Sequence, residues 1–141
     1  MFLLDTNVVS ELRRPRPDPR VVAWLRGVEP QHIYLSAVTL GEIQAGVEIM
    51  REQDLVKARA IETWADQVAE THEVLPMDAR AFRTWAKLMH RRSDDLIEDA
   101  MIAATALVHG LTVVTRNVRD FEALGVEVFN PFGPPGQDPM S

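Results

Sequence analysis

Phe2-Leu3-Leu4-Asp5-Thr6-Asn7 places three large apolar side chains directly before a carboxylate. An apolar run without polar alternation is typical of a strand that is covered on both faces, as in a parallel sheet with helices on either side. Ligands of open α/β sheets bind outside the carboxyl ends of the strands, so Asp5 is a candidate functional residue. The alternative is that Asp5 caps a following helix.

Length and composition favour one compact domain. The chain has 141 residues, of which 46% are hydrophobic and 26% charged. No apolar run approaches the ~20 residues of a membrane span and no secretory pattern is present, so we expect a soluble, cytoplasmic protein. Cysteine is absent, which removes disulfides, thiolate zinc sites and a cysteine nucleophile. The four histidines stand far apart and do not predict a metal site.

The net charge of −6 argues against a nucleic-acid partner, because phosphate contacts normally come from a surplus of lysine and arginine. The distribution of the basic residues qualifies this. They gather in two groups, Arg13, Arg14, Arg16, Arg20 and Arg26, and then Arg80, Arg83, Lys87, Arg91 and Arg92. Each group is either an ordinary solvated face or a basic rim that binds phosphate.

Hydrophobic periodicity and turn residues predict a β-α-β-αα-β-αα-β-α-β order. We expect strands at 2–4, 32–35, 73–76, 111–115 and 126–129, with helices over 8–12, 21–25, 78–92, 93–109 and 118–123. Residues 37–70 are expected to form a helical hairpin or one bent helical arm. Short connections of this kind predict a three-layer α/β/α sandwich around a mostly parallel sheet. The domain spans residues 1–132, and the breaker-rich residues 133–141 predict a mobile tail.

Several local features set the expected helix boundaries. Ser36 is a candidate N-cap, and Gly110 is expected to end the alanine-rich helix. Asp95 and Glu98 are spaced like a capping pair at the start of that helix. Phe82 is expected on the buried side of the helix that begins after Asp78.

Four acids occupy recurring positions in this order of elements. Asp5 follows the first strand, Glu42 lies in the helix after the second, Asp99 near the start of the alanine-rich helix, and Asp120 just beyond the 111–115 strand. All four can face one end of one sheet. Like charges a few Å apart raise one another's pKa, and a divalent cation resolves that conflict. Carboxylate ligands select Mg²⁺ or Mn²⁺, which can activate water and stabilise charge on a phosphodiester.

Each acid also has an ordinary structural interpretation. Glu42 can be a solvent-facing helix residue, Asp99 can compensate a helix dipole, and Asp120 can form a turn. Their coincidence at corresponding positions favours a site.

Four motifs carry these acids: Leu4-Asp5-Thr6-Asn7, Ser36-x-x-Thr39-x-Gly41-Glu42, Asp99-Ala100-x-Ile102-Ala103-Ala104-Thr105-Ala106 and Val114-Thr115-Arg116-Asn117-x-x-Asp120-Phe121. They resemble the motifs of PIN-domain ribonucleases, and most of all those of the VapC-type toxins of bacterial toxin–antitoxin pairs, including the FitB-like branch. The resemblance runs in register from Met1 to about Phe132 and shows no departure at the acids.

The resemblance implies an endoribonuclease that depends on Mg²⁺ or Mn²⁺. It implies that Asp5 and Asp99 are the principal metal ligands, with Glu42 as a further or water-mediated ligand and Asp120 as the fourth acid. By the same resemblance, four residues support the acids through hydrogen bonds: Thr6, Asn7, Thr115 and Asn117.

The resemblance also implies an RNA substrate, a homodimer, and an antitoxin that lays a basic or bulky side chain near the acidic pocket. It does not identify the RNA or the number of metal ions. Another hypothesis is a catalytically silent module that uses the acids to hold a basic partner. A phospho-acceptor domain is disfavoured because Arg116, not lysine, follows the late strand, and an Asp-x-Asp phosphatase because position 7 is Asn.

Overall fold

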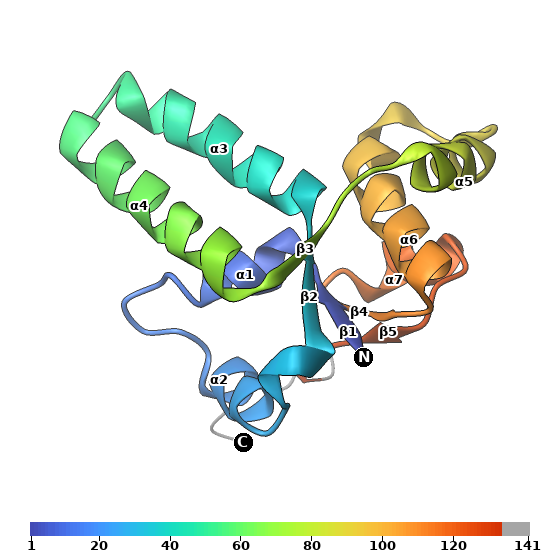
Figure 1. Cartoon of the computed structure of the whole chain (residues 1–141), viewed down its shortest axis with the longest axis horizontal. Coiled ribbons are helices and arrows are strands. Elements are labelled where there is room, and N and C mark those ends of the chain that lie inside the picture. The colour runs from blue at the N-terminus through green and yellow to red at the C-terminus, as the bar shows by residue number, and fades with distance from the viewer. Residues whose placement is uncertain (134–141) are drawn as a thin grey trace.

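The computed structural model describes residues 1–133, which are built around a parallel sheet of five strands in the order β3-β2-β1-β4-β5 (Figure 1). The strands are β1 (Phe2–Leu4), β2 (Ile33–Ser36), β3 (Glu73–Leu75), β4 (Thr112–Val114) and β5 (Val128–Phe129). Each neighbouring pair is parallel, which confirms the predicted sheet. Apart from Gly133, the predicted mobile tail lies outside the described residues.

The register brings the ends of the strands together at one edge. Leu4 of β1 pairs with Leu35 of β2 and with Val114 of β4. The Asp5 N–H continues the ladder and donates to the Val114 carbonyl at 2.9 Å. Because the strands are parallel, the next residues along the chain, Asp5 and Thr115, lie side by side at the carboxyl edge of the sheet.

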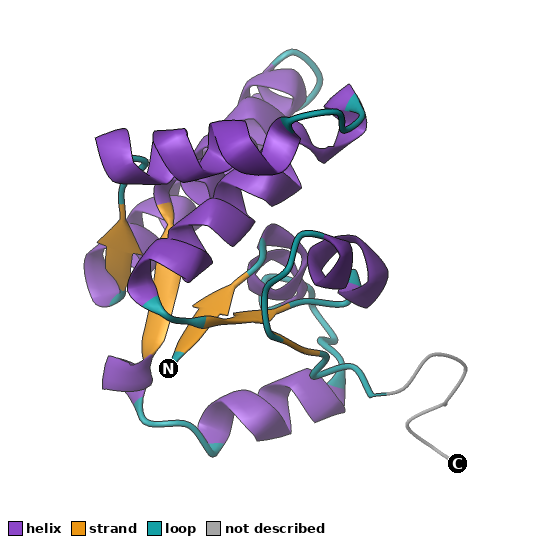
Figure 2. Ribbon diagram, turned by 90° about the vertical axis from the view of Figure 1, so that its right-hand side faces the viewer, coloured by secondary structure: helices purple, strands orange, loops and turns teal. Residues whose placement is uncertain are grey.

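Helices surround the sheet (Figure 2). One face is covered by α1 (Thr6–Glu11), α2 (Pro19–Arg26), α3 (Ala37–Arg51) and α4 (Leu55–Thr71), the other by α5 (Ala79–Met89), α6 (Ile97–His109) and α7 (Val118–Ala123). The predicted helical hairpin is formed by α3 and α4, which pack along each other (Figure 1). The three-layer α/β/α sandwich is therefore confirmed.

The first strand joins two apolar cores. Successive side chains of a strand point to opposite faces. Leu4 packs with Val8 and Val47 in the core under α1–α4. Leu3 packs with Ile102 and Phe121 in the core under α5–α7. Leu3 and Leu4 are at most 1% exposed, as the unbroken apolar run predicted.

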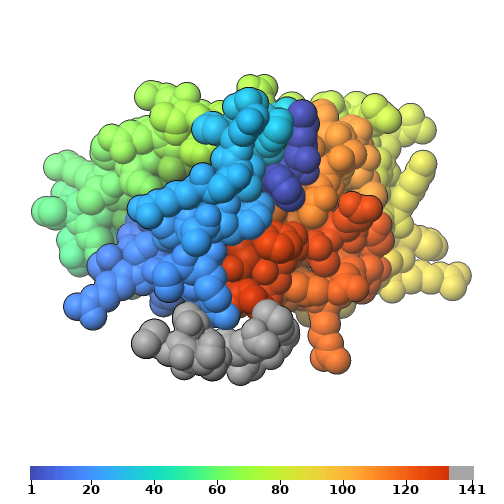
Figure 3. Space-filling view, turned by 90° about the horizontal axis from the view of Figure 1, so that it is seen from below, coloured from blue at the N-terminus to red at the C-terminus, as the bar shows by residue number. Residues whose placement is uncertain are grey.

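The α2 segment lies against the last strand, although about a hundred residues separate them along the chain. The Trp24 ring stands 5.3 Å from that of Phe129 and 5.1 Å from that of Phe2, measured between ring centroids. Figure 3 shows the face where the two segments meet. This aromatic contact ties α2 to both β1 and β5.

Three local predictions are wrong. The Asp95–Glu98 capping pair does not form. A single 3-10 turn, Asp94–Leu96, precedes α6, so the N-cap residue of α6 is Leu96, and no side-chain hydrogen bond caps this helix. The preceding helix, α5, ends at Met89 rather than near Arg92, because His90 leaves the helical conformation with ψ 116° and Arg91 is left-handed with φ 65°. Phe82 is 45% exposed, whereas Trp85, Leu88 and Met89 are the residues of α5 that pack on the core under α5–α7.

Two predicted boundaries are confirmed. The Ser36 hydroxyl accepts from the Val38 N–H at 3.1 Å and caps α3. Gly110 ends α6 at φ 66°, a left-handed conformation that favours glycine. Within residues 1–133, no helix combines the length and apolarity needed to cross a membrane.

We expect Ile102→Ala to lower the free energy of unfolding by about 2–5 kcal/mol, because this fully buried side chain of α6 would leave a cavity in the core. Leu107→Ala on the same helix is the control, with an expected loss below about 1 kcal/mol, since Leu107 is 43% exposed. Urea titrations of both variants measure the difference. Equal losses would contradict the assignment of Ile102 to the core.

Candidate active site

Asp5 lies at the end of β1 and is 4% exposed. Its Oδ1 accepts from the Thr6 N–H at 2.7 Å. Its Oδ2 accepts from the Thr115 hydroxyl at 2.8 Å and from Asn7 Nδ2 at 3.1 Å. Asp5 is therefore the N-cap of α1, as one interpretation of the sequence held, and also the centre of a polar network at the carboxyl edge of the sheet.

Glu42 joins this network through the first turn of α1. The Thr6 hydroxyl lies 3.0 Å from Glu42 Oε1 and 3.0 Å from the Thr39 hydroxyl. A hydroxyl has one proton and an ionised carboxylate can only accept, so Thr6 donates to Glu42 and accepts from Thr39. Thr6 thereby connects the residue after β1 to an acid on α3.

Asp99 and Asp120 are bridged by one amide group. Asn117 Nδ2 donates to Asp99 Oδ2 at 3.1 Å and to Asp120 Oδ2 at 2.9 Å. The Asn117 backbone N–H donates to the Thr115 hydroxyl oxygen at 2.8 Å. The first turns of α6 and α7 are thus connected through Asn117 and Thr115 to the carboxylate of Asp5.

All eight residues predicted for the site lie in this one hydrogen-bonded network, which we call the acidic network. Its members are Asp5, Thr6, Asn7, Glu42, Asp99, Thr115, Asn117 and Asp120. Within residues 1–133, no lysine or arginine forms an ion pair with any of its four acids. The hydrogen bonds that the carboxylates of the acidic network accept therefore come from neutral donors.

Burial disfavours the charged forms of Asp5, Glu42 and Asp99, and repulsion between the acids adds to this effect for Glu42 and Asp99. Burial raises the pKa of Asp5 against the opposing effect of its hydrogen bonds from Thr115 and Thr6. Burial also raises the pKa of Glu42, with the charge of Asp5 adding to it. The pKa of Asp99 is raised to about 6 by burial and then by the charges of the other acids, Asp5 first. The site therefore carries excess negative charge that a cation would relieve.

The chemistry of the donors fits a hard divalent cation, because all four candidate ligands are carboxylates. The acids are not gathered into a finished cage: among residues 1–133, no three acidic or histidine side chains stand together as a metal-binding group. Mg²⁺ does not require such a cage, since it keeps several waters and is usually bound through one or two carboxylates. The acidic network therefore fits a hydrated ion better than a dehydrated one.

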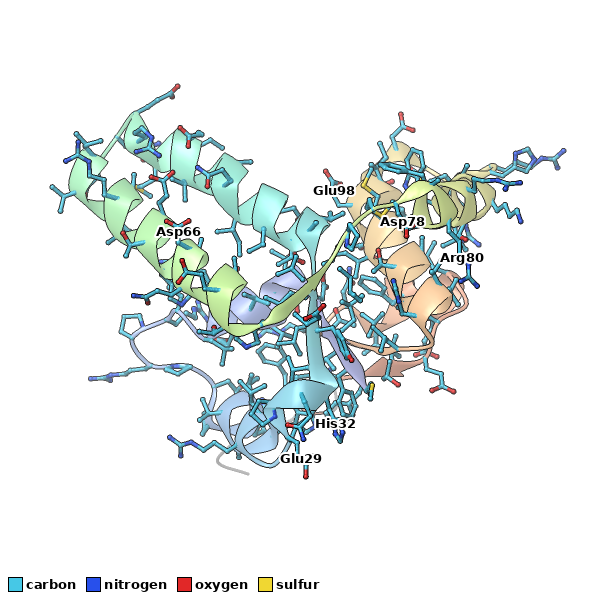
Figure 4. All side chains as sticks on the ribbon, viewed as in Figure 1. Glu29, His32, Asp66, Asp78, Arg80 and Glu98 are labelled. Carbon is cyan, nitrogen blue, oxygen red and sulfur yellow. The ribbon has the colours of Figure 1, made fainter. Side chains whose placement is uncertain are left out.

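Three residues near the acidic network were not predicted as part of it. Glu98 lies on the side of α6 that faces α3 (Figure 4), and its charge raises the pKa of Asp99 and Glu42 after the larger effect of burial. Glu11, at the end of α1, is a buried carboxylate that forms an ion pair with Arg116. Two patterns could have indicated Glu11 and Arg116: Glu11 lies one helical turn beyond Asn7, and Arg116 stands between two network residues.

This fold and this edge of acids define a class of protein. The model of the PIN domain matches residues 2–127, and the chain belongs to the PIN domain family.

Individual relatives match over almost their full length. The chain is 37% identical to VapC ribonuclease Y4jK of Sinorhizobium fredii, covering 95% of this chain and 99% of the relative. It is also 37% identical to Toxin FitB of Neisseria gonorrhoeae, over 94% and 99%. The crystal structure of FitAcB from Neisseria gonorrhoeae superposes with a TM-score of 0.83 at 37% identity, over 94% of this chain and 99% of that one.

The raised pKa of Asp99 predicts a stabilising substitution. Its folded-state pKa of about 6 exceeds the ordinary value of 3.8, so in the metal-free protein its contribution to stability is lost as the pH rises from about 4 through 6. We expect Asp99→Asn to raise the Tm of metal-free protein at about pH 8 by roughly 2–4 °C, after discounting for the partial exposure of this group.

Thermal unfolding in the presence of a chelator at several pH values measures this effect. The difference between Asp99→Asn and the unmodified chain should shrink towards zero at about pH 4, where both side chains are neutral. A Tm difference that does not depend on pH would contradict the electrostatic explanation.

Proposed function

We propose that this protein is a metal-dependent endoribonuclease that acts as the toxin of a toxin–antitoxin pair. The observation that carries the proposal is the acidic network. It links four carboxyl groups, from the residue after β1 and from α3, α6 and α7, without a basic counter-charge from residues 1–133. Membership of the PIN domain family and the names of the relatives, a VapC ribonuclease and a FitB toxin, support it.

We assign the metal to the carboxylates of Asp5 and Asp99, with Glu42 and Asp120 as further or water-mediated ligands. Mg²⁺ and Mn²⁺ are the two ions that suit carboxylates and water. When bound, such an ion lowers the pKa of water and stabilises negative charge on a phosphodiester.

The side chains around the acids orient them. Thr115 and Asn7 hold one oxygen of Asp5, and the Thr6 N–H holds the other, so the buried carboxylate has a fixed direction. Asn117 keeps Asp99 and Asp120 at a fixed separation. Supporting hydrogen bonds of this kind typically contribute about 10–100-fold to metal affinity or activity.

We expect Asp5→Asn and Asp99→Asn each to reduce RNA cleavage by more than about 100-fold, because a lost ligand should cost more than a lost supporting bond. Thr115→Val, which keeps the volume and removes the hydroxyl, should cost about 10–100-fold. Cleavage of a labelled RNA is the measurement. A chelator should abolish cleavage, and added Mg²⁺ or Mn²⁺ should restore it.

Asp66→Asn is the matched control, since Asp66 is an exposed acid on α4 (Figure 4) and its loss should leave the rate unchanged. Circular dichroism checks that each variant is folded. Full cleavage by pure Asp5→Asn protein would reject the assignment of the site. Metal binding without RNA cleavage would favour the catalytically silent binding module.

The proposed partners are RNA as substrate, a cognate antitoxin and a second copy of the chain, in the cytoplasm. An arginine of the antitoxin would find in the acidic network the charges that a metal otherwise balances. We expect Asp99→Asn combined with Glu42→Gln to weaken antitoxin binding by about ten-fold, the usual scale of a charge-assisted hydrogen bond.

Calorimetric titration of the purified chain with the antitoxin encoded beside it measures this effect, and light scattering of the same samples gives the number of chains. Equal affinity for the antitoxin with and without these two charges would contradict insertion of a basic side chain into the acidic network.

A further inference from the structure

Arg116 is a half-exposed cation that is held in place at the rim of the acidic network. It lies between Thr115 and Asn117, and its backbone N–H donates to Asn7 Oδ1 at 3.3 Å. Its guanidinium carbon stands 3.8 Å from the centroid of the Phe132 ring. One guanidinium nitrogen lies 3.6 Å from Glu11 Oε1. The side chain nevertheless stays 56% exposed.

The carboxylate that holds Arg116 does not neutralise it fully. Glu11 is 5% exposed and also forms an ion pair with Arg14 at 3.4 Å. Asp18 is a second carboxylate that interacts with the charge of Arg116, but it is paired with Arg20 at 3.2 Å. Two carboxylates therefore stand among three guanidinium groups, and one positive charge is in surplus in this cluster. This surplus positive charge faces solvent next to the acidic network.

Stability alone does not account for this arrangement. An ion pair with an exposed partner contributes little to stability, while burying the Glu11 carboxylate has a cost. A planar guanidinium packed on an aromatic ring loses little freedom when it forms hydrogen bonds, and its remaining donors match the geometry of a phosphate. The contacts with Glu11 and Phe132 thus orient Arg116 for an anion.

An RNA strand meets opposing charges at this edge. The acidic network repels phosphates, and a fixed cation at its rim offsets that repulsion for a neighbouring phosphate. We propose that Arg116, oriented by Glu11 and Phe132, binds a backbone phosphate of the RNA next to the acidic network. This inference rests on the proposed function, because it takes RNA to be the substrate.

The basic residues of α5 offer a contrast. Arg80 lies on the flank of the molecule away from α3 (Figure 4). It is exposed, and within the described part of the chain no carboxylate pairs with it and no aromatic ring packs on it. Arg80 therefore serves as a matched control for the loss of one exposed arginine charge.

The salt dependence of RNA binding tests the proposal. Each phosphate contact that a protein makes with a single strand contributes about −0.7 to the slope of log K against log salt concentration. We expect Arg116→Met to make this slope less negative by about 0.7 and to weaken binding about ten-fold at low salt. Methionine keeps apolar contact with Phe132 while it removes the charge, so the variant should fold.

The measurement uses Asp99→Asn protein, which should not cleave, with fluorescein-labelled oligouridine and fluorescence anisotropy in chelator at several KCl concentrations. In this background Arg116→Lys should keep the slope and lose part of the affinity, because it keeps the charge but not the planar fork. Arg80→Met should change neither. A structural role of Arg116 would lower the Tm and leave the slope as it was.

An unchanged slope in folded Arg116→Met protein would overturn the proposal, and so would an equal change in Arg80→Met. The outcome for the proposed function is separate. If the unmodified chain with Mn²⁺ cleaves RNA but the slope does not respond to Arg116, the nuclease assignment stands and this inference fails. If Arg116→Met changes the slope but the unmodified chain with Mn²⁺ cleaves no RNA, the phosphate contact of Arg116 stands and the nuclease assignment fails.

Discussion

The burial of the Asp5 carboxylate is the constraint on which the rest of the site depends. A charged group at 4% exposure must be stabilised by donors or a cation, and here two side chains and one backbone N–H provide the donors. Those donors come from α1 and from the residue after β4. The pairing of β1 with β4 therefore has to be in register for Asp5 to be tolerated at all.

From this carboxylate the same hydrogen bonds extend to the other acids. Thr6 connects it to Glu42, and Thr115 connects it through Asn117 to Asp99 and Asp120. In this network, neutral hydrogen-bond donors lie between the carboxylates. A bound metal ion would instead draw the carboxylates together. Burial, and then the charges of the neighbouring acids, raise the pKa of Asp99. Such a site costs the metal-free protein stability, a common feature of functional sites.

Sequence patterns predicted most of the fold and the four acids of the acidic network, and the resemblance to PIN-domain ribonucleases implied its four supporting residues. The unbroken apolar run before Asp5 indicated a strand buried on both faces, and Leu3 and Leu4 do fill two separate cores. The patterns failed where local spacing was ambiguous. Asp95 and Glu98 have the spacing of a capping pair, but a 3-10 turn sets the start of α6 and leaves both side chains free of that role. Helical phase alone did not show that Phe82 faces outward.

The sequence by itself determined which residue types stand after which strands, because strand periodicity and motif spacing are local properties of the chain. Tertiary structure alone decided that Asn117 bridges Asp99 and Asp120, and that Glu11 and Phe132 hold Arg116. These contacts join residues up to about a hundred positions apart. Their partners are chosen by the register of parallel strands and by the packing of helices on the sheet, which no local pattern encodes.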